Sequence, residues 1–589
     1  MGISPTTRRR VLKGMALGAA GLGAGAGQAQ QSESIATAVG LDPETTETGR
    51  GIDGRTLADA EKLFDVRYTD AEREQILLEI DDWVDRSARL RAVAKPNGLA
   101  PANVFDPRLP TSSYREQANE ITPSGRQAGA IPSDVNDIAF APVWKLSQWI
   151  HSGAITSQRL TRIYLDRIAQ HAGRLECFVT VTPELALDEA MHADRELASG
   201  NSRGPLHGIP YGLKDIIDVA GIRSTWGATP YQDRVAEADA TVAIQLREAG
   251  AVLLGKTTCG AIAYGDRWFG GVTRNPWNTQ EGSSGSSAGS ASATAAGLVG
   301  FSIGTETLGS IISPSQRCGT TGLRPTFGRV SRAGAMALCW SLDKIGPITR
   351  SAEDAGFVLG AINGFDASDA SSIGVGFEAD MSRDVRGMRV GYNPAWFENA
   401  ADADRAALGA LRDAGVVLVE KSMPDLPYDA LFATVEAEAA AAFEELTLSG
   451  QDDDLVWQEP SAWPNTWRRA RFISAVDLIN VDRLRRQVMN AADAMFSDID
   501  AMVGPNFAGA MLVITNFTGH PSLAVRSGYT RQPTRTIFGS PADESDATYR
   551  VPHVTSLWAP LFEEGNLIAL GREIEDRLGV AADRPEGFA

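Results

Sequence analysis

From about Val135 onward, the chain alternates short apolar segments with longer amphipathic ones. Residues 177–181 and 251–254 are short apolar runs typical of buried strands, whereas 241–248 and the segment around 160–168 have helical spacing. Strands that alternate with helices are typical of layered α/β proteins, because the helices that join the strands cover the sheet. The sequence therefore predicts an α/β fold for the central part of the chain.

The first 29 residues have the pattern of an export signal. The segment 7–13 reads Thr-Arg-Arg-Arg-Val-Leu-Lys, and a Gly/Ala-rich apolar run follows from 14 to about 26. A paired arginine before a short apolar run and a small-residue end is typical of a twin-arginine signal. An uncleaved anchor helix is the alternative, but the run is short for a membrane span. We expect cleavage, no stable membrane insertion afterwards, and a periplasmic or extracellular location.

Residues 30–135 are expected to form a linker and a helical N-terminal arm. The stretch 30–55 is rich in polar residues and Gly, which is typical of a flexible linker. Thr69 and Glu72 form a capping-box pattern, and apolar residues continue at helical spacing until Pro96. Residues 99–135 are irregular. The main domain is expected at 136–580, with a mostly helical insertion at about 425–500.

Charge and cysteine content exclude two classes of function. The chain has 55 Lys and Arg against 74 Asp and Glu, a net charge of −19, and no long basic run. A nucleic-acid partner is therefore not expected, because binding phosphates needs a basic surface. The four cysteines lie far apart without CxxC spacing, so they indicate neither a zinc site nor a disulfide framework.

Two short motifs match known patterns but lack the physical context that those patterns need. Residues 250–257 satisfy the phosphate-loop pattern, yet the positions between the glycines are Ala-Val-Leu-Leu, the apolar body of a strand. Residues 285–289 satisfy GxSxG with Ser287 as nucleophile, but the preceding stretch is turn-like. Its histidine partner would be His520 or His553, neither in a recognisable context. We expect neither motif to be functional.

A third, longer pattern consists of spaced segments rich in Gly and Ser. They are His-Gly-Ile-Pro-Tyr-Gly-Leu-Lys-Asp at 207–215, Gly-Ser-Ser-Gly-Ser-Ser-Ala-Gly-Ser at 282–290, Gly-Thr-Glu-Thr-Leu-Gly-Ser at 304–310, Cys-Gly-Thr-Thr-Gly-Leu-Arg-Pro-Thr at 318–326 and Asn-Phe-Thr-Gly-His-Pro at 516–521. Here the sequence resembles the amidase signature family of serine hydrolases, from about residue 140 to 350 and again at 516–521. The resemblance implies a layered fold with a large mixed β-sheet covered by helices on both faces, and makes 136–580 the catalytic domain.

The resemblance also implies the catalytic residues. Lys214 falls on the family's base, Ser310 on its nucleophile, and Ser286 on the bridging serine, which the family holds through a cis peptide. The oxyanion donors would be the backbone amides of Thr307, Leu308, Gly309 and Ser310. This chemistry implies no metal and no cofactor.

The chemistry requires a neutral lysine. A serine hydroxyl is a weak nucleophile unless a base takes its proton, and the free lysine pKa is about 10.4. Burial away from carboxylates can lower that pKa by about three units. We expect Asp215 to face away from Lys214, because adjacent strand residues point to opposite faces. Ser286 can then relay the proton from Ser310 to Lys214.

The chain departs from the common family pattern at a few positions. Glu306 stands where Asp is usual, Leu308 replaces a Gly in the oxyanion loop, and Ile312 stands where an Arg often follows the nucleophile. Ser284 and Ala288 replace glycines around the bridging serine. The departures at Leu308 and Ile312 are expected to affect the acyl pocket and the recognition of acidic substrates.

The sequence predicts an exported amidase that hydrolyses a small-molecule amide through an acyl-enzyme. The alternative is the glutaminase-type A subunit of an aminoacyl-tRNA amidotransferase, which shares the motifs. A GxSxG esterase and a binding protein without catalysis are further alternatives. The helical arm is expected either to cover the active-site mouth or to support a homodimer.

Overall fold

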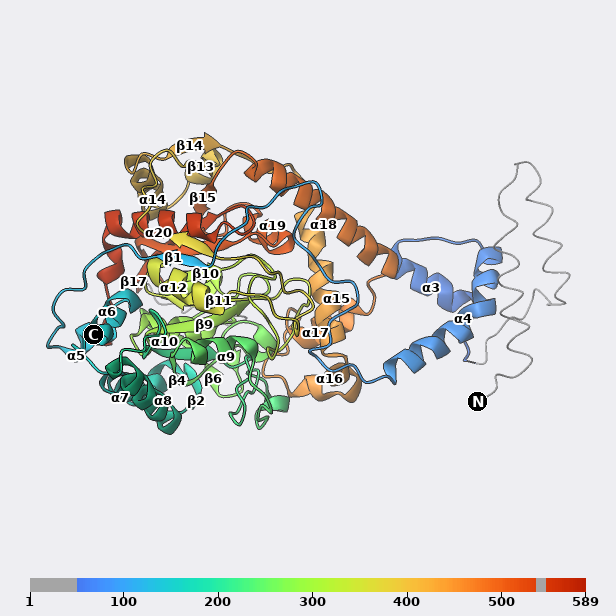
Figure 1. Cartoon of the computed structure of the whole chain (residues 1–589). Helices are drawn as coiled ribbons and strands as arrows, with labels where there is room; N and C mark the ends of the chain where they lie inside the picture. The colour runs from blue at the N-terminus through green and yellow to red at the C-terminus, as the bar shows by residue number, and fades with distance from the viewer. Residues whose placement is uncertain (1–49, 536–546, 589) are drawn as a thin grey trace. The chain divides into compact units, whose positions relative to one another are not determined.

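The structure is a computed structural model that describes residues 50–535 and 547–588 (Figure 1). The chain divides into two compact units, one ending at Lys95 and the other beginning at Pro96. The predicted export signal and the linker up to residue 49 lie outside the described residues. The irregular segment 96–134, which the sequence groups with the arm, belongs to the second unit.

The first unit is a pair of helices, α3 (Gly54–Phe64) and α4 (Asp70–Arg91). The predicted capping box is confirmed, because the Thr69 hydroxyl accepts from the Glu72 amide at 3.3 Å and the Glu72 carboxylate accepts from the Thr69 amide at 2.7 Å. An ion pair at 2.7 Å joins Arg73 of α4 to Glu61 of α3. The helical spacing in this segment does not mark a buried face, since Trp83 and Leu90 are exposed.

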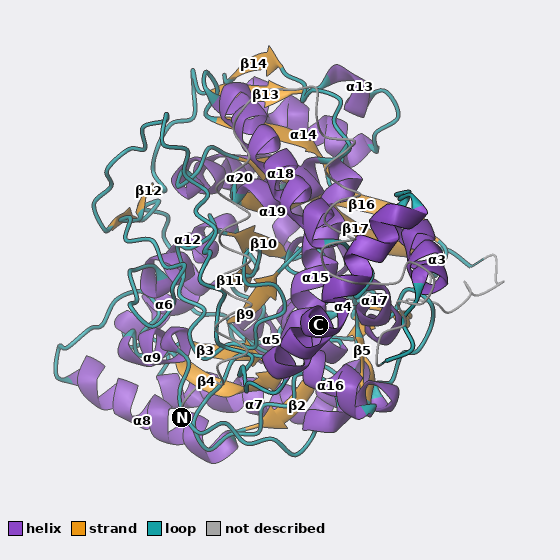
Figure 2. Ribbon diagram, turned by 90° about the vertical axis from the view of Figure 1, so that its right-hand side faces the viewer, coloured by secondary structure: helices purple, strands orange, loops and turns teal. Residues whose placement is uncertain are grey.

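The second unit is built around a mixed sheet of eleven strands (Figure 2). An antiparallel middle lies between two groups of parallel strands, and one edge strand is again antiparallel to its neighbour. In spatial order the strands are β14 (Val417–Glu420), β13 (Arg389–Tyr392), β15 (Ala501–Pro505), β17 (Tyr549–Trp558), β16 (Ser522–Gln532), β10 (Thr321–Arg324), β11 (Lys344–Thr349), β9 (Phe301–Glu306), β3 (Pro210–Lys214), β4 (Val252–Thr257) and β2 (Phe178–Val181).

Helices cover both faces of this sheet, as the α/β prediction requires. Successive strand residues point to opposite faces, and β16 shows the result. Leu523 and Val525 join the main core with α12 (Ala352–Ile362) and α20 (Glu564–Leu578), whereas Ala524 packs in a separate cluster with α10 (Ala288–Ala295) and α11 (Ile312–Cys318). Apolar side chains on both faces therefore bury the sheet between two helical layers.

The remaining helices and short strands complete this unit. The predicted helices around 160–168 and at 241–248 are present as α7 (Ser157–Leu175) and α9 (Thr241–Glu248), and α8 (Pro183–Ala198) lies between them in the sequence. The others are α5 (Val135–Ala139), α6 (Val143–His151), α13 (Pro394–Phe397), α14 (Asp402–Asp413), α19 (Met511–Thr518), the parallel pair β1 (Glu120–Thr122) and β12 (Glu378–Asp380), and the ribbons β5 (Arg267–Trp268) with β6 (Gly271–Val272) and β7 (Arg274–Asn275) with β8 (Asn278–Gly282).

The segment 425–500 is mostly helical, as predicted, and connects β14 to β15. It contains α15 (Phe432–Ala442), α16 (Glu444–Ser449), α17 (Trp463–Ala470) and α18 (Ala475–Phe496). Its acidic stretch forms a 3₁₀ turn, η4 (Gln451–Asp454). The Trp463 indole donates to the carbonyl of Ile262 at 2.8 Å, which ties α17 to the main core.

The four cysteines, Cys177, Cys259, Cys318 and Cys339, are all buried and unpaired with one another. Burial raises the pKa of each thiol. None of the helices in the described ranges combines the length and the apolar character needed to cross a membrane.

Candidate active site

Lys214 is the last residue of β3, where the strand lies between the parallel strands β4 and β9. Its side chain is fully buried. The Lys214 Nζ donates to the Ser286 hydroxyl at 2.8 Å and to the Thr305 hydroxyl at 2.7 Å. The sheet therefore brings together a lysine and a serine that lie 72 residues apart.

The environment of Lys214 favours its neutral form. Burial lowers the pKa of the lysine from 10.5 to about 8, and the charges of Asp343 and Glu306 offset only part of this effect. Asp215 points away, as predicted: its carboxylate accepts from the Thr225 amide at 2.9 Å and lies 3.5 Å from Lys256. No carboxylate therefore pairs directly with the amine within the described part of the chain.

Ser286 lies in the loop between β8 and α10. The Gly285–Ser286 peptide is cis, as the resemblance implies. A Cβ on Gly285 would lie 1.8 Å from the carbonyl oxygen of Gly265, so only glycine fits there. Ser284 has φ of 60°, the left-handed region that glycine favours, and its amide donates to Asp266 at 2.9 Å. Ser284 therefore has a backbone conformation that glycine favours, and its amide is held by Asp266.

Ser310 is half-buried at the end of a loop that follows β9. The Ser287 amide donates to the Ser310 carbonyl at 3.1 Å, which places Ser310 beside the loop of Ser286. The Ser310 hydroxyl has no hydrogen-bond partner among residues 50–535 and 547–588. Lys214 and Ser286 are thus in direct contact, and Ser310 lies beside the loop of Ser286 without a hydrogen bond between the two hydroxyls. Catalytic hydrogen bonds are often long without substrate.

A buried carboxylate holds the loop of Ser310. Glu306 accepts from the amides of Ile311 at 2.8 Å and Ile312 at 3.0 Å, and also from Arg324 at 2.8 Å and Asn516 at 3.0 Å. Burial raises the pKa of the Glu306 carboxyl, but the Arg324 charge and the amides outweigh burial and lower it to about 2. The loop is therefore fixed on both sides of Ser310 by one ionised group.

The amides predicted to bind an oxyanion are available. Across residues 50–535 and 547–588, no acceptor is assigned to the amides of Thr307, Leu308, Gly309 and Ser310. Gly309 has φ of 94°, a conformation that suits glycine, whereas Leu308 lies outside the left-handed region. Leu308 is therefore accommodated without strain. Unpaired, fixed amides stabilise negative charge that develops on a carbonyl oxygen.

Ile312 does not line this site. It is buried at the start of α11 and packs in the cluster that contains Ala291 of α10 and Val554 of β17. Its side chain therefore stabilises the core beneath the loop. No contact of Ile312 with the described residues supports the expected effect of position 312 on substrate recognition.

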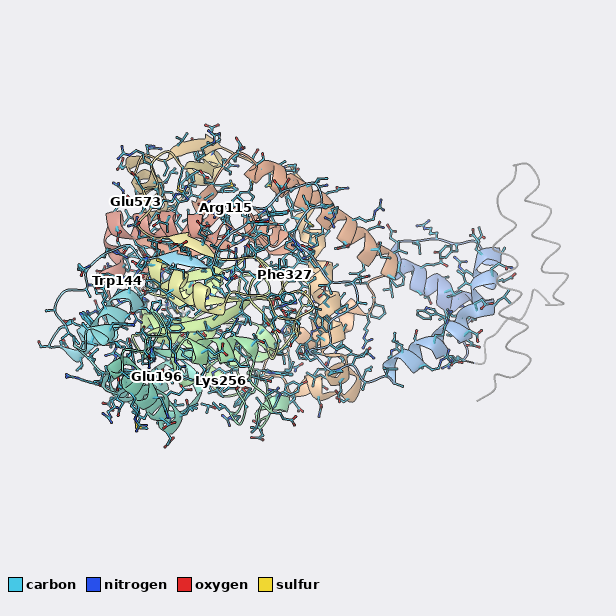
Figure 3. The ribbon with its side chains drawn as sticks, viewed as in Figure 1. Arg115, Trp144, Glu196, Lys256, Phe327 and Glu573 are labelled. Atoms are coloured by element: carbon cyan, nitrogen blue, oxygen red, sulfur yellow. The ribbon has the colours of Figure 1, made fainter. Side chains whose placement is uncertain are left out.

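Neither short motif is functional. Most of the segment 250–257 is the buried strand β4, which carries Lys256 (Figure 3). Lys256 is paired with the buried Asp215 at 3.5 Å. A strand, β8, does precede the GxSxG segment, contrary to the turn-like prediction. Even so, the Ser287 hydroxyl donates to the carbonyl and accepts from the amide of Thr305, both at 3.0 Å. Ser287 is thus a structural bridge to β9.

The two histidines proposed for that motif have other partners. His520 lies 2.7 Å from the Thr518 hydroxyl, and burial lowers the pKa of its ring to about 3. His553 lies 2.8 Å from the Asp404 carboxylate. A serine–histidine elbow is therefore wrong for this chain.

Three residues near the site were not predicted to have a role. Thr305 is the second partner of Lys214. Asp343 accepts from the Thr307 hydroxyl at 2.6 Å and so holds the start of the oxyanion loop. Asn516 lies in the motif at 516–521, but the motif does not indicate its contact with Glu306, which joins residues 210 positions apart. Only Thr305 had a usable signal, since it lies on the strand that leads into the nucleophile loop.

Known proteins share both the sequence pattern and this architecture. The family model described as Amidase matches residues 159–550. The A subunit of glutamyl-tRNA(Gln) amidotransferase from Roseiflexus sp. (strain RS-1) is 40% identical over 302 residues, which cover 49% of this chain but only 62% of that relative. Its counterpart of the same name from Pseudomonas savastanoi pv. phaseolicola (strain 1448A / Race 6) is 32% identical over 468 residues, or 74% of this chain and 96% of the relative.

Among solved structures, the native peptide amidase from Stenotrophomonas maltophilia superposes with a TM-score of 0.64. It is 29% identical and covers 76% of this chain and 98% of its own. The family match, the near-complete alignment with one relative and the shared fold agree with the motifs at residues 207–215, 282–290 and 304–310. The chain therefore belongs to the amidase family.

Proposed function

We propose that this chain hydrolyses the C–N bond of a linear carboxylic amide through an acyl-enzyme on Ser310. The observation that carries the proposal is the buried Lys214, which has no directly paired carboxylate among the described residues and contacts Ser286 at 2.8 Å. A lysine can act as a base near neutral pH only in such surroundings. The unpaired amides of the Ser310 loop supply the oxyanion site.

In the first half-reaction, Ser310 Oγ bonds to the carbonyl carbon of the substrate. Its proton passes to Ser286 as the Ser286 proton passes to the neutral amine of Lys214. The negative charge on the carbonyl oxygen is stabilised by the loop amides. The C–N bond then breaks as Ser286 protonates the leaving nitrogen and recovers a proton from Lys214, which leaves an ester on Ser310.

In the second half-reaction, water takes the place of the amine. The water proton passes through Ser286 to Lys214 as the oxygen bonds to the acyl carbon. The ester bond breaks, the Ser310 oxygen regains a proton, and the carboxylic acid leaves. The proton that Ser310 gives up leaves with the amine and is replaced by one from the water, and both pass by way of Ser286 and Lys214.

The substrate is proposed to be a small amide, met outside the cytoplasm if the twin-arginine signal directs export. The second candidate function is glutamine hydrolysis as a component of an amidotransferase, because the two relatives described above are named as A subunits of glutamyl-tRNA(Gln) amidotransferase. The net charge of −19 gives no support for binding tRNA. A homodimer stays a prediction.

Labelling with a fluorophosphonate, followed by peptide mapping, tests the proposal. We expect the adduct on Ser310, no adduct on Ser287, and loss of labelling and amide hydrolysis in Ser310→Ala. The matched control is Ser313→Ala, which changes a serine three positions further along the chain. An adduct on Ser287, or hydrolysis that persists in Ser310→Ala, would contradict the proposal.

A further inference from the structure

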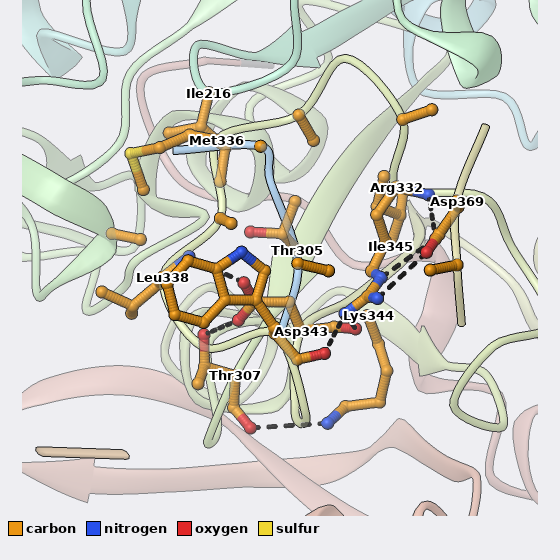
Figure 4. Close-up of a pocket in the computed structure, with 18 of the residues that line it drawn as sticks. Ile216, Thr305, Thr307, Arg332, Met336, Leu338, Asp343, Lys344, Ile345 and Asp369 are labelled. Atoms are coloured by element: carbon orange, nitrogen blue, oxygen red, sulfur yellow. Dashed lines mark hydrogen bonds and ion pairs between the residues drawn. The ribbon is translucent and has the colours of Figure 1, made fainter. Parts of the chain in front are cut away.

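A cavity of about 250 Å³ adjoins the proposed reaction centre (Figure 4). Its inner wall includes Thr305, whose hydroxyl contacts Lys214 Nζ at 2.7 Å, and Thr307 of the oxyanion loop. Its outer wall includes Ser368 and Ala370, which are exposed. The cavity therefore extends from the surface to the groups that surround the triad lysine.

The charged side chains in the wall already have partners. Arg332 donates to both oxygens of Asp369 at 3.1 Å and to the Trp340 carbonyl at 2.6 Å. Asp343 accepts from the Thr307 hydroxyl at 2.6 Å through one oxygen and from the amide of Leu338 at 2.8 Å through the other. Arg332 and Asp369 neutralise each other, and both carboxylate oxygens of Asp343 already accept hydrogen bonds, so these groups offer little to a charged ligand.

The one lysine in the described wall is also turned to the backbone. Lys344 is buried, and its Nζ donates to the carbonyl of Leu342 and, at 3.5 Å, to that of Thr307. Burial lowers the pKa of Lys344 well below its usual value. The cavity thus has no side-chain charge without a partner among the described residues that line it.

Between these groups the wall is apolar. Ile216, Met336, Leu338 and Ile345 are buried and line the inner part. An apolar cavity of about 150 Å³ is enough to hold benzene. A cavity of this size and lining fits an uncharged group of roughly six to ten carbon atoms.

We infer that this cavity holds an uncharged apolar substituent of the amide substrate. The inference rests on the proposed function, since Thr305 and Thr307 connect the cavity to the reacting groups. A zwitterionic substrate such as glutamine would place unpaired charges against an apolar wall, at a high cost in binding. The substituent is carried by either the acyl carbon or the leaving nitrogen, and the two are distinguished by experiment.

Two substrate series test the inference on the full-length chain. The acyl series is acetamide, butanamide, hexanamide and benzamide, and the amine series is N-methyl-, N-butyl- and N-phenylacetamide. In the series whose substituent enters the cavity, kcat/KM should rise about fourfold for each added methylene until the cavity is filled. The other series should be nearly flat. Two flat series, or a preference for glutamine over hexanamide, would overturn the inference.

Two substitutions of opposite effect link the size preference to this cavity. Leu338→Ala enlarges it and should shift the preferred substituent to a larger one. Ala335→Phe fills it and should reduce hydrolysis of the large substituents at least tenfold while sparing acetamide. Leu448→Ala, an exposed position outside the cavity, is the control and should change neither profile.

The outcomes separate the two proposals. If both cavity variants keep the wild-type size profile while Ser310 is still labelled, the cavity inference is wrong and the proposed function stands. If Ser310→Ala leaves hydrolysis of every amide unchanged, the proposed function itself is wrong. Thermal unfolding of both cavity variants verifies that a changed profile comes from a folded protein.

Discussion

The dependence of hydrolysis on pH tests the role of Lys214 directly. With a pKa of about 8, roughly one tenth of the lysine is neutral at pH 7 and about nine tenths at pH 9. The value of kcat/KM should therefore rise about tenfold between these pH values and level off above them. A lysine with its ordinary pKa of 10.5 would give about a hundredfold rise, with no plateau by pH 9. The change in the lysine pKa from 10.5 to about 8 corresponds to about 3 kcal/mol in favour of the neutral amine.

The assay is initial-rate release of ammonia from benzamide, measured below KM across pH 6 to pH 11. Lys214→Met removes the base and should lower kcat/KM at least about a hundredfold at every pH, because positioned general bases contribute that much. Lys62→Met, on the exposed surface of α3, is the matched control and should keep the wild-type curve. A curve that rises through pH 8 in Lys214→Met as it does in the wild type would refute the assignment.

Two further predictions concern buried carboxylates. Glu306→Gln leaves the Arg324 charge buried without its partner, so the free energy of unfolding should fall by about 3–5 kcal/mol, and an unchanged thermal midpoint would contradict this. Burial raises the pKa of Glu575 from 4.5 to about 7, so between these values the folded chain holds a proton that the unfolded chain has lost. The free energy of unfolding should therefore fall as the pH rises from 5 to 7. In Glu575→Gln, the free energy of unfolding measured with urea should depend less on pH over this range, and an equal dependence in both proteins would contradict the prediction.

Local patterns predicted the individual elements well. Helix α9 begins at Thr241 and ends at Glu248 as the spacing indicates, and the Thr69 capping box starts α4. These features depend on neighbouring residues alone. The burial of α4 could not be read in this way, because Trp83 lies at a helical apolar spacing and is nevertheless exposed.

The motifs and their order along the chain predicted the residues of the site, but they did not predict the contacts that hold those residues in place. Lys214 and Ser286 meet because β3 lies beside β9, and Ser287, the neighbour of Ser286, is hydrogen-bonded to Thr305 of β9. The contacts of Glu306 with Arg324 and Asn516 join three distant segments, and strand order must be known before such contacts can be foreseen. Sequence periodicity carries no information about which strands are neighbours.

The burial of all four thiols has a practical consequence for work with the protein. A thiol reacts as the thiolate, and burial both blocks access and disfavours that form. In an oxidising compartment the folded chain would offer no sulfur for crosslinking to another copy. Alkylation by iodoacetamide would then proceed only as the chain opens, so mass spectrometry could count unfolded molecules by their added carbamidomethyl groups, without any engineered probe.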